Sequence, residues 1–277
     1  MRYNELWRKL HDGGYTEGEA KAITRFLLTD KYGMTTADML CEDICKFTEA
    51  DVFSADVGAL MSFTPVQYVV GKAWFCDRQF TVRPGCLIPR PETEELCRWI
   101  ERDMSLVSPS ILDVGTGSGC IAVTLALDIN GASVDACDLS DDAIAIANDN
   151  IHLLKADVNV LKCDALNPPV DMDKYDVIVS NPPYICNSER SGMDANVLEY
   201  EPDMALFVPD DDALLFYRSI SRYASKALRN GGALYFEINP IYVSEIKDMQ
   251  IEIGFYSVEI REDQFGKQRF IKTTRKR

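Results

Sequence analysis

Apolar residues recur at intervals of three or four along the first quarter of the chain, the spacing that places them on one face of a helix. The positions that carry this pattern are Leu6, Leu10, Ile23, Phe26 and Leu27. Thr16, with a glutamate three residues later, is typical of a helix start, and Thr35 and Thr64 precede two further candidate helices. We therefore expect residues 1–73 to form a small bundle of short helices.

Near residue 74 the pattern changes to bulky apolar residues alternating with polar ones. The segment WFCDRQFTV, residues 74–82, shows this alternation, which predicts a β-hairpin. Arg83, Pro84 and Gly85 follow it as a turn signal. We expect residues 74–88 to link two domains.

From residue 108 onward, short apolar segments alternate with amphipathic ones. The predicted strands are 111–115, 133–139, 158–164, 175–181 and 233–238, and the predicted helices are 121–129, 141–154 and 211–228. Asn230-Gly231-Gly232 is a candidate C-cap for the last helix, and the end of the chain supplies an antiparallel pair. Such alternation is typical of a mainly parallel, doubly wound α/β sheet, which we expect over residues 89–277.

The charge of the chain narrows its possible partners. A net charge of −15 and a pI of about 4.6 repel phosphate backbones, so a protein or small molecule is favoured as substrate over nucleic acid. No apolar run approaches the roughly 20 residues that span a bilayer, and the charged N-terminus is not a signal peptide. We expect a cytoplasmic protein without membrane contact.

Nine cysteines are scattered along the chain without any C-x-x-C pair. With only two histidines to supplement them, a zinc site is not expected, nor any other metal. These cysteines are interpreted as small buried apolar residues in a reducing compartment.

A glycine-rich loop follows the first strand of the α/β pattern. It comprises Asp113, Gly115, Thr116, Gly117, Ser118 and Gly119. Glycines let the backbone turn sharply and approach a ligand closely. Cys120 stands where a dinucleotide fingerprint has Gly or Ala, and Asp113 could meet a cationic ligand rather than a pyrophosphate. The loop therefore predicts a site for a nucleoside ligand that carries a positive charge and not for a dinucleotide.

Two aspartates end the next two predicted strands. Asp138 could accept both ribose hydroxyls of a nucleoside, and Asp164 could meet an adenine amino group, because open α/β sheets bind ligands at this edge. The alternative is that both are helix N-caps.

Asn181-Pro182-Pro183-Tyr184 closes the fourth predicted strand, beside the glycine loop. An amide nitrogen is a poor nucleophile, so methylating it requires that the NH₂ group be held. The Asn181 side-chain oxygen could accept one N–H and the Pro182 carbonyl the other, with the two prolines keeping the backbone extended. Tyr184 offers a wall for the planar group. The alternative is a proline-rich turn without chemistry.

Several segments together resemble the HemK/PrmC family, the release factor glutamine N5-methyltransferases. They lie between residues 65 and 207 and read P-V-Q-Y-V-V-G from Pro65, L-I-P-R-P-E-T-E from Leu87, D-V-G-T-G-S-G-C-I-A from Asp113, N-P-P-Y-I from Asn181, and E-P with A-L-F from Glu201. The resemblance implies a Rossmann-like class I methyltransferase domain preceded by a helical domain that grips the release factor. It also implies S-adenosylmethionine as cofactor, contacted at Gly115–Gly119, Asp138 and Asn181. The implied target is the glutamine of a Gly-Gly-Gln tripeptide in bacterial class-1 release factors.

The chain departs from the family pattern in two places. Asn239-Pro240-Ile241-Tyr242 stands where the family usually has G-x-x-Q, which removes any contact made by that Gly and Gln. Ala165 stands where many relatives carry an aromatic residue, which weakens adenine stacking. The stretch from Arg90 to Glu94 either contacts cofactor or substrate or only begins a helix.

Three other functions are compatible with parts of the pattern. A DNA or RNA adenine-N6 methyltransferase uses the same amino-group chemistry on a flipped base, but the acidic surface counts against it. The G-x-G-x-G spacing counts against a nicotinamide oxidoreductase, and the intact N-P-P-Y counts against a binding module without catalysis.

Overall fold

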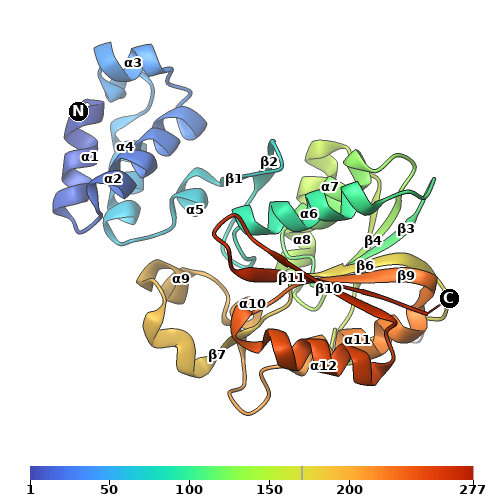
Figure 1. Ribbon diagram of the computed structural model, residues 1–277. Helices are drawn as coiled ribbons and strands as arrows, with labels where there is room; N and C mark the ends of the chain where they lie inside the picture. The colour runs from blue at the N-terminus through green and yellow to red at the C-terminus, as the bar shows by residue number, and fades with distance from the viewer. Residues whose placement is uncertain (170, 277) are drawn as a thin grey trace. The chain divides into compact units, whose positions relative to one another are not determined.

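The computed structural model describes residues 1–169 and 171–276 and divides the chain into two compact units (Figure 1). The first unit comprises Met1–Lys72, Val82–Pro84 and Asp194–Tyr200, and the second comprises Ala73–Thr81, Gly85–Met193 and Glu201–Arg277.

The first unit is helical, as its apolar pattern predicts. Its helices are α1 (Tyr3–Asp12), α2 (Glu17–Phe26), the π-helical η1 (Leu27–Lys31), α3 (Thr36–Cys41), the 3₁₀ turn η2 (Ile44–Lys46), α4 (Ala50–Met61), α5 (Val66–Val70) and α9 (Ala195–Tyr200). Thr16 and Thr35 both form capping boxes, with Glu19 and Asp38 respectively. Leucines of α1, η1 and α4 are fully buried in the core of this unit.

The expected hairpin joins β1 (Lys72–Phe75) to β2 (Arg78–Thr81). Its two turn residues, Cys76 and Asp77, both have positive φ, of 45° and 60°. This is the type I′ geometry whose twist matches the flanking strands.

The second unit is built on a seven-stranded sheet of order β10-β11-β9-β6-β3-β4-β5. The strands are β3 (Ser110–Val114), β4 (Ser133–Asp138), β5 (Val158–Lys162), β6 (Tyr175–Ser180), β9 (Leu228–Glu237), β10 (Ser257–Glu262) and β11 (Gln268–Thr274). β9, β6, β3, β4 and β5 are mutually parallel, and β11 is antiparallel to both of its neighbours. The expected doubly wound α/β fold is confirmed.

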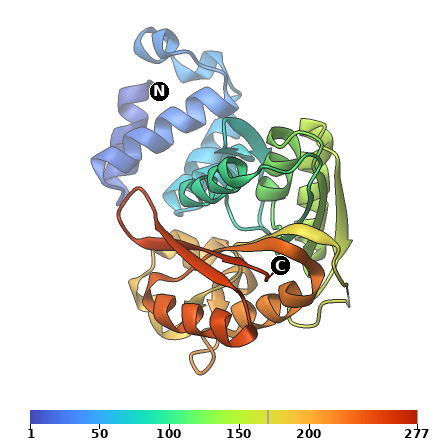
Figure 2. The same cartoon turned by 45° about the vertical axis from the view of Figure 1, so that its right-hand side comes forward.

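Helices cover both faces of this sheet (Figure 2). One layer contains α6 (Pro91–Asp103), α7 (Cys120–Asp128) and α8 (Asp141–Leu154), and the other contains α11 (Leu215–Ala227) and α12 (Val243–Ile253). Successive strand residues point to opposite layers, so Val177 and Val179 pack in the first core and Ile178 in the second. Burial on both faces explains why the strands read as continuous apolar runs.

A segment between β6 and α11 escaped the sequence pattern. It contains β7 (Ile185–Cys186), the 3₁₀ helix η3 (Asn187–Gly192), α10 (Asp203–Leu206) and β8 (Phe207–Val208), in addition to α9. β7 and β8 pair in parallel, with Ile185 opposite Phe207. The N-P-P-Y-I and A-L-F segments therefore lie side by side although 22 residues separate these partners.

Two expectations were wrong. Asn230-Gly231-Gly232 does not cap a helix: α11 ends at Ala227, and β9 starts at Leu228 and runs through the glycines, where its register against β6 shifts. Gly231 takes a φ of 80° inside this bulge. Cys41 and Cys45 are exposed rather than buried, because the short helices α3 and η2 bury Met39 and Ile44 instead. No described helix is long and apolar enough to cross a membrane.

Candidate active site

The glycine loop and the N-P-P-Y segment meet where the strand order reverses. β3 lies between β4 and β6, and Val114, its last residue, pairs with Ser180, the last residue of β6. The Ser180 hydroxyl donates to the Val114 carbonyl at 2.6 Å. In open parallel sheets this point, at the carboxyl ends of the strands, is where ligands bind.

A cavity of about 350 Å³ opens at this point, within the size range of small-molecule sites. Seven of the twelve residues predicted to bind cofactor or substrate line it: Gly115, Gly117, Asp138, Asp164, Asn181, Pro182 and Pro183. Much of the remaining wall is apolar and includes Leu139, Ala143, Ala165, Phe216 and Ile220. Ala165 is thus one of several apolar side chains available to a flat base, and Phe216 supplies an aromatic ring that sequence position did not reveal.

Glycines shape the backbone of the loop. Gly115, Gly117 and Gly119 have φ values of 74°, 55° and 80°, which disfavour any side chain. A Cβ on Gly115 or Gly117 would meet open space, whereas on Gly119 it would come within 3.2 Å of the Ala147 Cβ. The first two glycines therefore leave room for a ligand, and the third allows α7 to pack closely on α8.

Asp138 holds the loop as well as lining the cavity. Its carboxylate accepts the Gly117 N–H and the Ser140 N–H, both at 2.9 Å. Ser140 is the residue that caps α8, and Asp164 precedes a turn, where it accepts the Leu166 N–H at 2.8 Å. The alternative that these aspartates are helix N-caps is therefore wrong.

Five of the residues singled out do not line the cavity: Asp113, Thr116, Ser118, Gly119 and Tyr184. Asp113 is fully buried, and the Thr116 hydroxyl donates to it at 2.6 Å. Burial raises the pKa of Asp113 to about 7. In this structure Asp113 braces the glycine loop from behind.

Asn181 is held by a chain of buried side chains. Its Nδ2 donates to the Thr93 hydroxyl at 3.2 Å, which donates to Glu237 Oε2 at 2.6 Å. The Tyr184 hydroxyl donates to Glu237 Oε1 at 3.0 Å. Among the described residues, neither Asn181 Oδ1 nor the Pro182 carbonyl has a hydrogen-bond partner. Two acceptors beside the cavity are thus left for a ligand that brings N–H groups.

The segment around Arg90 does begin a helix, since α6 starts at Pro91. Arg90 itself pairs with Glu201 at 2.6 Å, and the same carboxylate accepts the Ile88 N–H at 3.0 Å. Neither charged residue lines the cavity, but Leu87, which precedes Ile88, and Pro202, which follows Glu201, do. This pair therefore joins two wall segments of the cavity.

Asn239 occupies the place of the usual family glycine. Its Nδ2 donates to the Tyr184 carbonyl at 3.1 Å and to Glu189 at 3.2 Å. The Asn239 N–H donates to the Tyr217 hydroxyl at 3.1 Å. The departure in sequence thus adds hydrogen bonds that hold the end of the N-P-P-Y segment.

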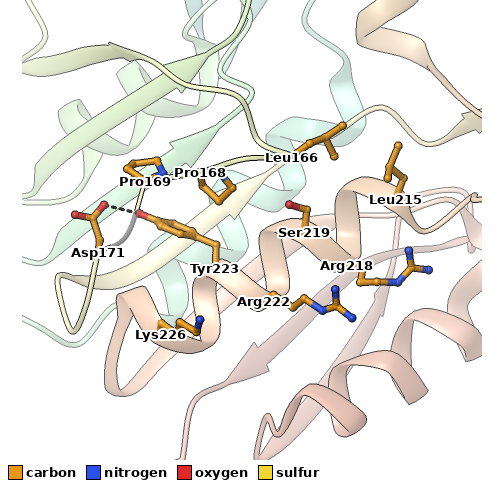
Figure 3. Close-up of a pocket in the computed structure, with 10 residues that line it drawn as sticks. All are labelled: Leu166, Pro168, Pro169, Asp171, Leu215, Arg218, Ser219, Arg222, Tyr223 and Lys226. Atoms are coloured by element: carbon orange, nitrogen blue, oxygen red, sulfur yellow. Dashed lines mark hydrogen bonds between the residues drawn. The ribbon is translucent and has the colours of Figure 1, made fainter.

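A second cavity, of about 410 Å³, lies along the outer side of α11 (Figure 3). Arg218, Arg222 and Lys226 project from the helix, and the Tyr223 hydroxyl donates to Asp171 at 2.8 Å. None of the residues singled out from the sequence lines it.

Comparison with known proteins gives the site its context. A family model described as methyltransferase small domain matches residues 93–198. A release factor glutamine methyltransferase of Bacteroides thetaiotaomicron is 42% identical over 268 residues, 94% of this chain and 95% of the relative. One of Flavobacterium psychrophilum is 44% identical over 212 residues, 75% of this chain and 74% of the relative. A solved methyltransferase from Pyrococcus furiosus superposes with a TM-score of 0.52 at 19% identity, covering 72% of this chain and 89% of the other, which shows the fold alone.

Proposed function

The chain belongs to the release factor glutamine methyltransferases, S-adenosylmethionine-dependent enzymes, and from this premise we propose its substrate and the role of its residues. The substrate is the side-chain amide nitrogen, N5, of the glutamine in the Gly-Gly-Gln tripeptide of class-1 release factors. The pair of free acceptors at Asn181 and Pro182, beside the cavity, carries this proposal. Since release factors act on ribosomes, the reaction belongs in the cytoplasm.

The residues present suit the cofactor. Gly115 and Gly117 leave open space at the cavity, Asp138 and Asp164 bring carboxylates, and an apolar wall suits a flat base. Asp138 already accepts two backbone N–H groups, yet each carboxylate oxygen can accept a second hydrogen bond, as ribose hydroxyls require. When bound, S-adenosylmethionine supplies an electrophilic methyl carbon.

The residues of this chain hold the nucleophile. Asn181 Oδ1 accepts one N–H of the glutamine amide and the Pro182 carbonyl accepts the other. These acceptors stabilise the positive charge that develops on nitrogen as the new N–C bond forms. They also hold the nitrogen in position for the attack, which lowers the barrier further. The extra proton leaves to water, so no strong base is needed. Pro183 keeps the Pro182 carbonyl in an extended backbone, and Tyr184 holds the segment through Glu237.

We further propose that residues 1–73 form the domain that recognises the release factor. Residues 74–88 then link this domain to residues 89–277, which catalyse the methyl transfer. The Gly-Gly-Gln tripeptide offers few side chains, so most of the affinity must come from other surface.

A transfer assay with labelled S-adenosylmethionine tests the function. Purified release factor should take up label, a release factor with Gly-Gly-Ala should not, and DNA should not. Label on DNA but not on the release factor would instead favour the adenine-N6 alternative.

A further inference from the structure

Four side chains from separate parts of the second unit form one hydrogen-bonded chain behind the cavity. Asn181 follows β6, Thr93 lies on α6, Glu237 ends β9, and Tyr184 closes the N-P-P-Y segment. Thr93 and Glu237 are only 3% and 2% exposed, so water does not compete for these bonds. The arrangement of these four side chains therefore fixes which group donates and which accepts in each hydrogen bond between them.

Counting protons gives that direction. Glu237 as a carboxylate only accepts, and it receives the Tyr184 and Thr93 hydroxyls on its two oxygens. The single proton of Thr93 is committed to Glu237, so its oxygen can only accept from Asn181. Asn181 must then present Nδ2 to Thr93, which leaves Oδ1 for the substrate.

We propose that Thr93 and Glu237 are positioning residues that set which end of the Asn181 carboxamide faces the substrate. The two ends have nearly the same shape, so packing alone cannot select one of them. In the wrong orientation Nδ2 would meet the NH₂ of the glutamine, donor against donor, and the nitrogen would lose an acceptor. This inference rests on the proposed function, because it assumes an amide substrate at Asn181.

Protonation of Glu237 would reverse the direction of the hydrogen bonds that link Glu237, Thr93 and Asn181. A protonated Glu237 could donate to Thr93, whose proton would then be available to Asn181 Oδ1. The groups that act on Glu237 are Thr93 and Glu92 from α6, Tyr184 after β6, and Arg269 from β11. Burial raises the pKa of Glu237, while Thr93, Tyr184 and Arg269 oppose that rise. The turnover number should therefore fall as the pH drops through this raised pKa.

Two single variants and one control test the role of Thr93. Thr93→Val keeps the shape and removes the hydroxyl, and it should lower kcat by about 10- to 100-fold, the range for a buried polar group left unpaired. Affinity for S-adenosylmethionine should not change. Thr93→Ser should restore most of kcat. Thr124→Val is the control, because Thr124 is equally buried and its hydroxyl has no partner among the described residues.

Two further measurements distinguish the proposed positioning role of Thr93 and Glu237 from a merely structural role. In an Asn181→Ala background, Thr93→Val should add almost no further loss, since both changes remove the same interaction. Glu237→Gln should lower kcat and flatten the acidic side of the pH profile. Full additivity of the two losses, or a Thr93→Val enzyme with unchanged kcat, would overturn the inference.

The activity of the wild-type enzyme shows whether the positioning role alone is wrong or the proposed function is wrong as well. If wild type methylates the release factor glutamine and Thr93→Val does so equally well, only the positioning role is wrong. If wild type does not methylate that glutamine, the proposed function is wrong and the inference falls with it.

Discussion

Removing the Glu201 carboxylate should loosen the wall of the cavity without touching its lining. Glu201 has a side chain that is 1% exposed, and it holds both the Ile88 N–H and the Arg90 guanidinium. In Glu201→Ala the buried Ile88 N–H loses a charged acceptor, which costs about 1.5–3 kcal/mol. The Arg90 side chain is 32% exposed, so solvent screening limits the loss of the ion pair to about 1 kcal/mol or less.

Together these terms predict a loss of about 2–4 kcal/mol in the free energy of unfolding. For a domain of this size, that corresponds to a drop in Tm of about 5–15 °C. Affinity for S-adenosylmethionine should fall as well, because Leu87, next to Ile88, and Pro202, next to Glu201, line the cavity.

Thermal unfolding and calorimetric titration of the cofactor measure both effects. Glu199→Ala is the control, since Glu199 is an exposed glutamate two residues away. The double variant Arg90→Met/Glu201→Gln should be more stable than Arg90→Met alone, because the single change leaves a buried charge without its partner. Equal Tm values for Glu201→Ala and Glu199→Ala would refute the reasoning.

Three more outcomes are expected. Asp138→Ala should weaken binding of S-adenosylmethionine by about 1.5–3 kcal/mol, and an unchanged dissociation constant by calorimetry would reject the ribose role. The pKa of Asp113, raised to about 7, means that the folded state holds this proton more tightly than the unfolded state, so its contribution to stability is lost as the pH rises through about 7. The Tm of Asp113→Asn relative to wild type should therefore rise from pH 5 to pH 8, and a constant difference would contradict the buried carboxyl. Deleting residues 1–73 should lower kcat/KM far more on the intact release factor than on a short Gly-Gly-Gln peptide, whereas equal losses would assign those residues to stability alone.

The sequence predicted the elements whose periodicity is strong. α8 begins and ends where its apolar pattern does, and the capping boxes at Thr16 and Thr35 start their helices as expected. The pattern failed at the end of α11, where three polar and glycine residues resemble a cap yet form a bulge inside β9. Local composition cannot distinguish the two, because pairing of β9 with β6 decides the outcome.

In the site, too, features that depend on local sequence were predictable, and features that depend on long-range contacts were not. Cavity-lining residues at or just after the end of a strand, such as Gly117 and Asp138, were predictable from that place in the chain. Thr93, Glu237 and Asn239 were not, because their roles arise from contacts across 88, 144 and 55 residues of chain. The only signal for Thr93 was its place in the L-I-P-R-P-E-T-E segment, and Asn239 stood out only as a departure from the family pattern.

We propose that this enzyme methylates one amide nitrogen, which Asn181 holds. Tandem mass spectrometry of a purified class-1 release factor, after incubation with the enzyme and S-adenosylmethionine, tests it most directly. A single added methyl group should lie on the glutamine of the Gly-Gly-Gln peptide, and Asn181→Ala should form it about 10²–10³ times more slowly while remaining folded. A methyl group on another residue, none at all, or an Asn181→Ala enzyme as fast as wild type would contradict the account.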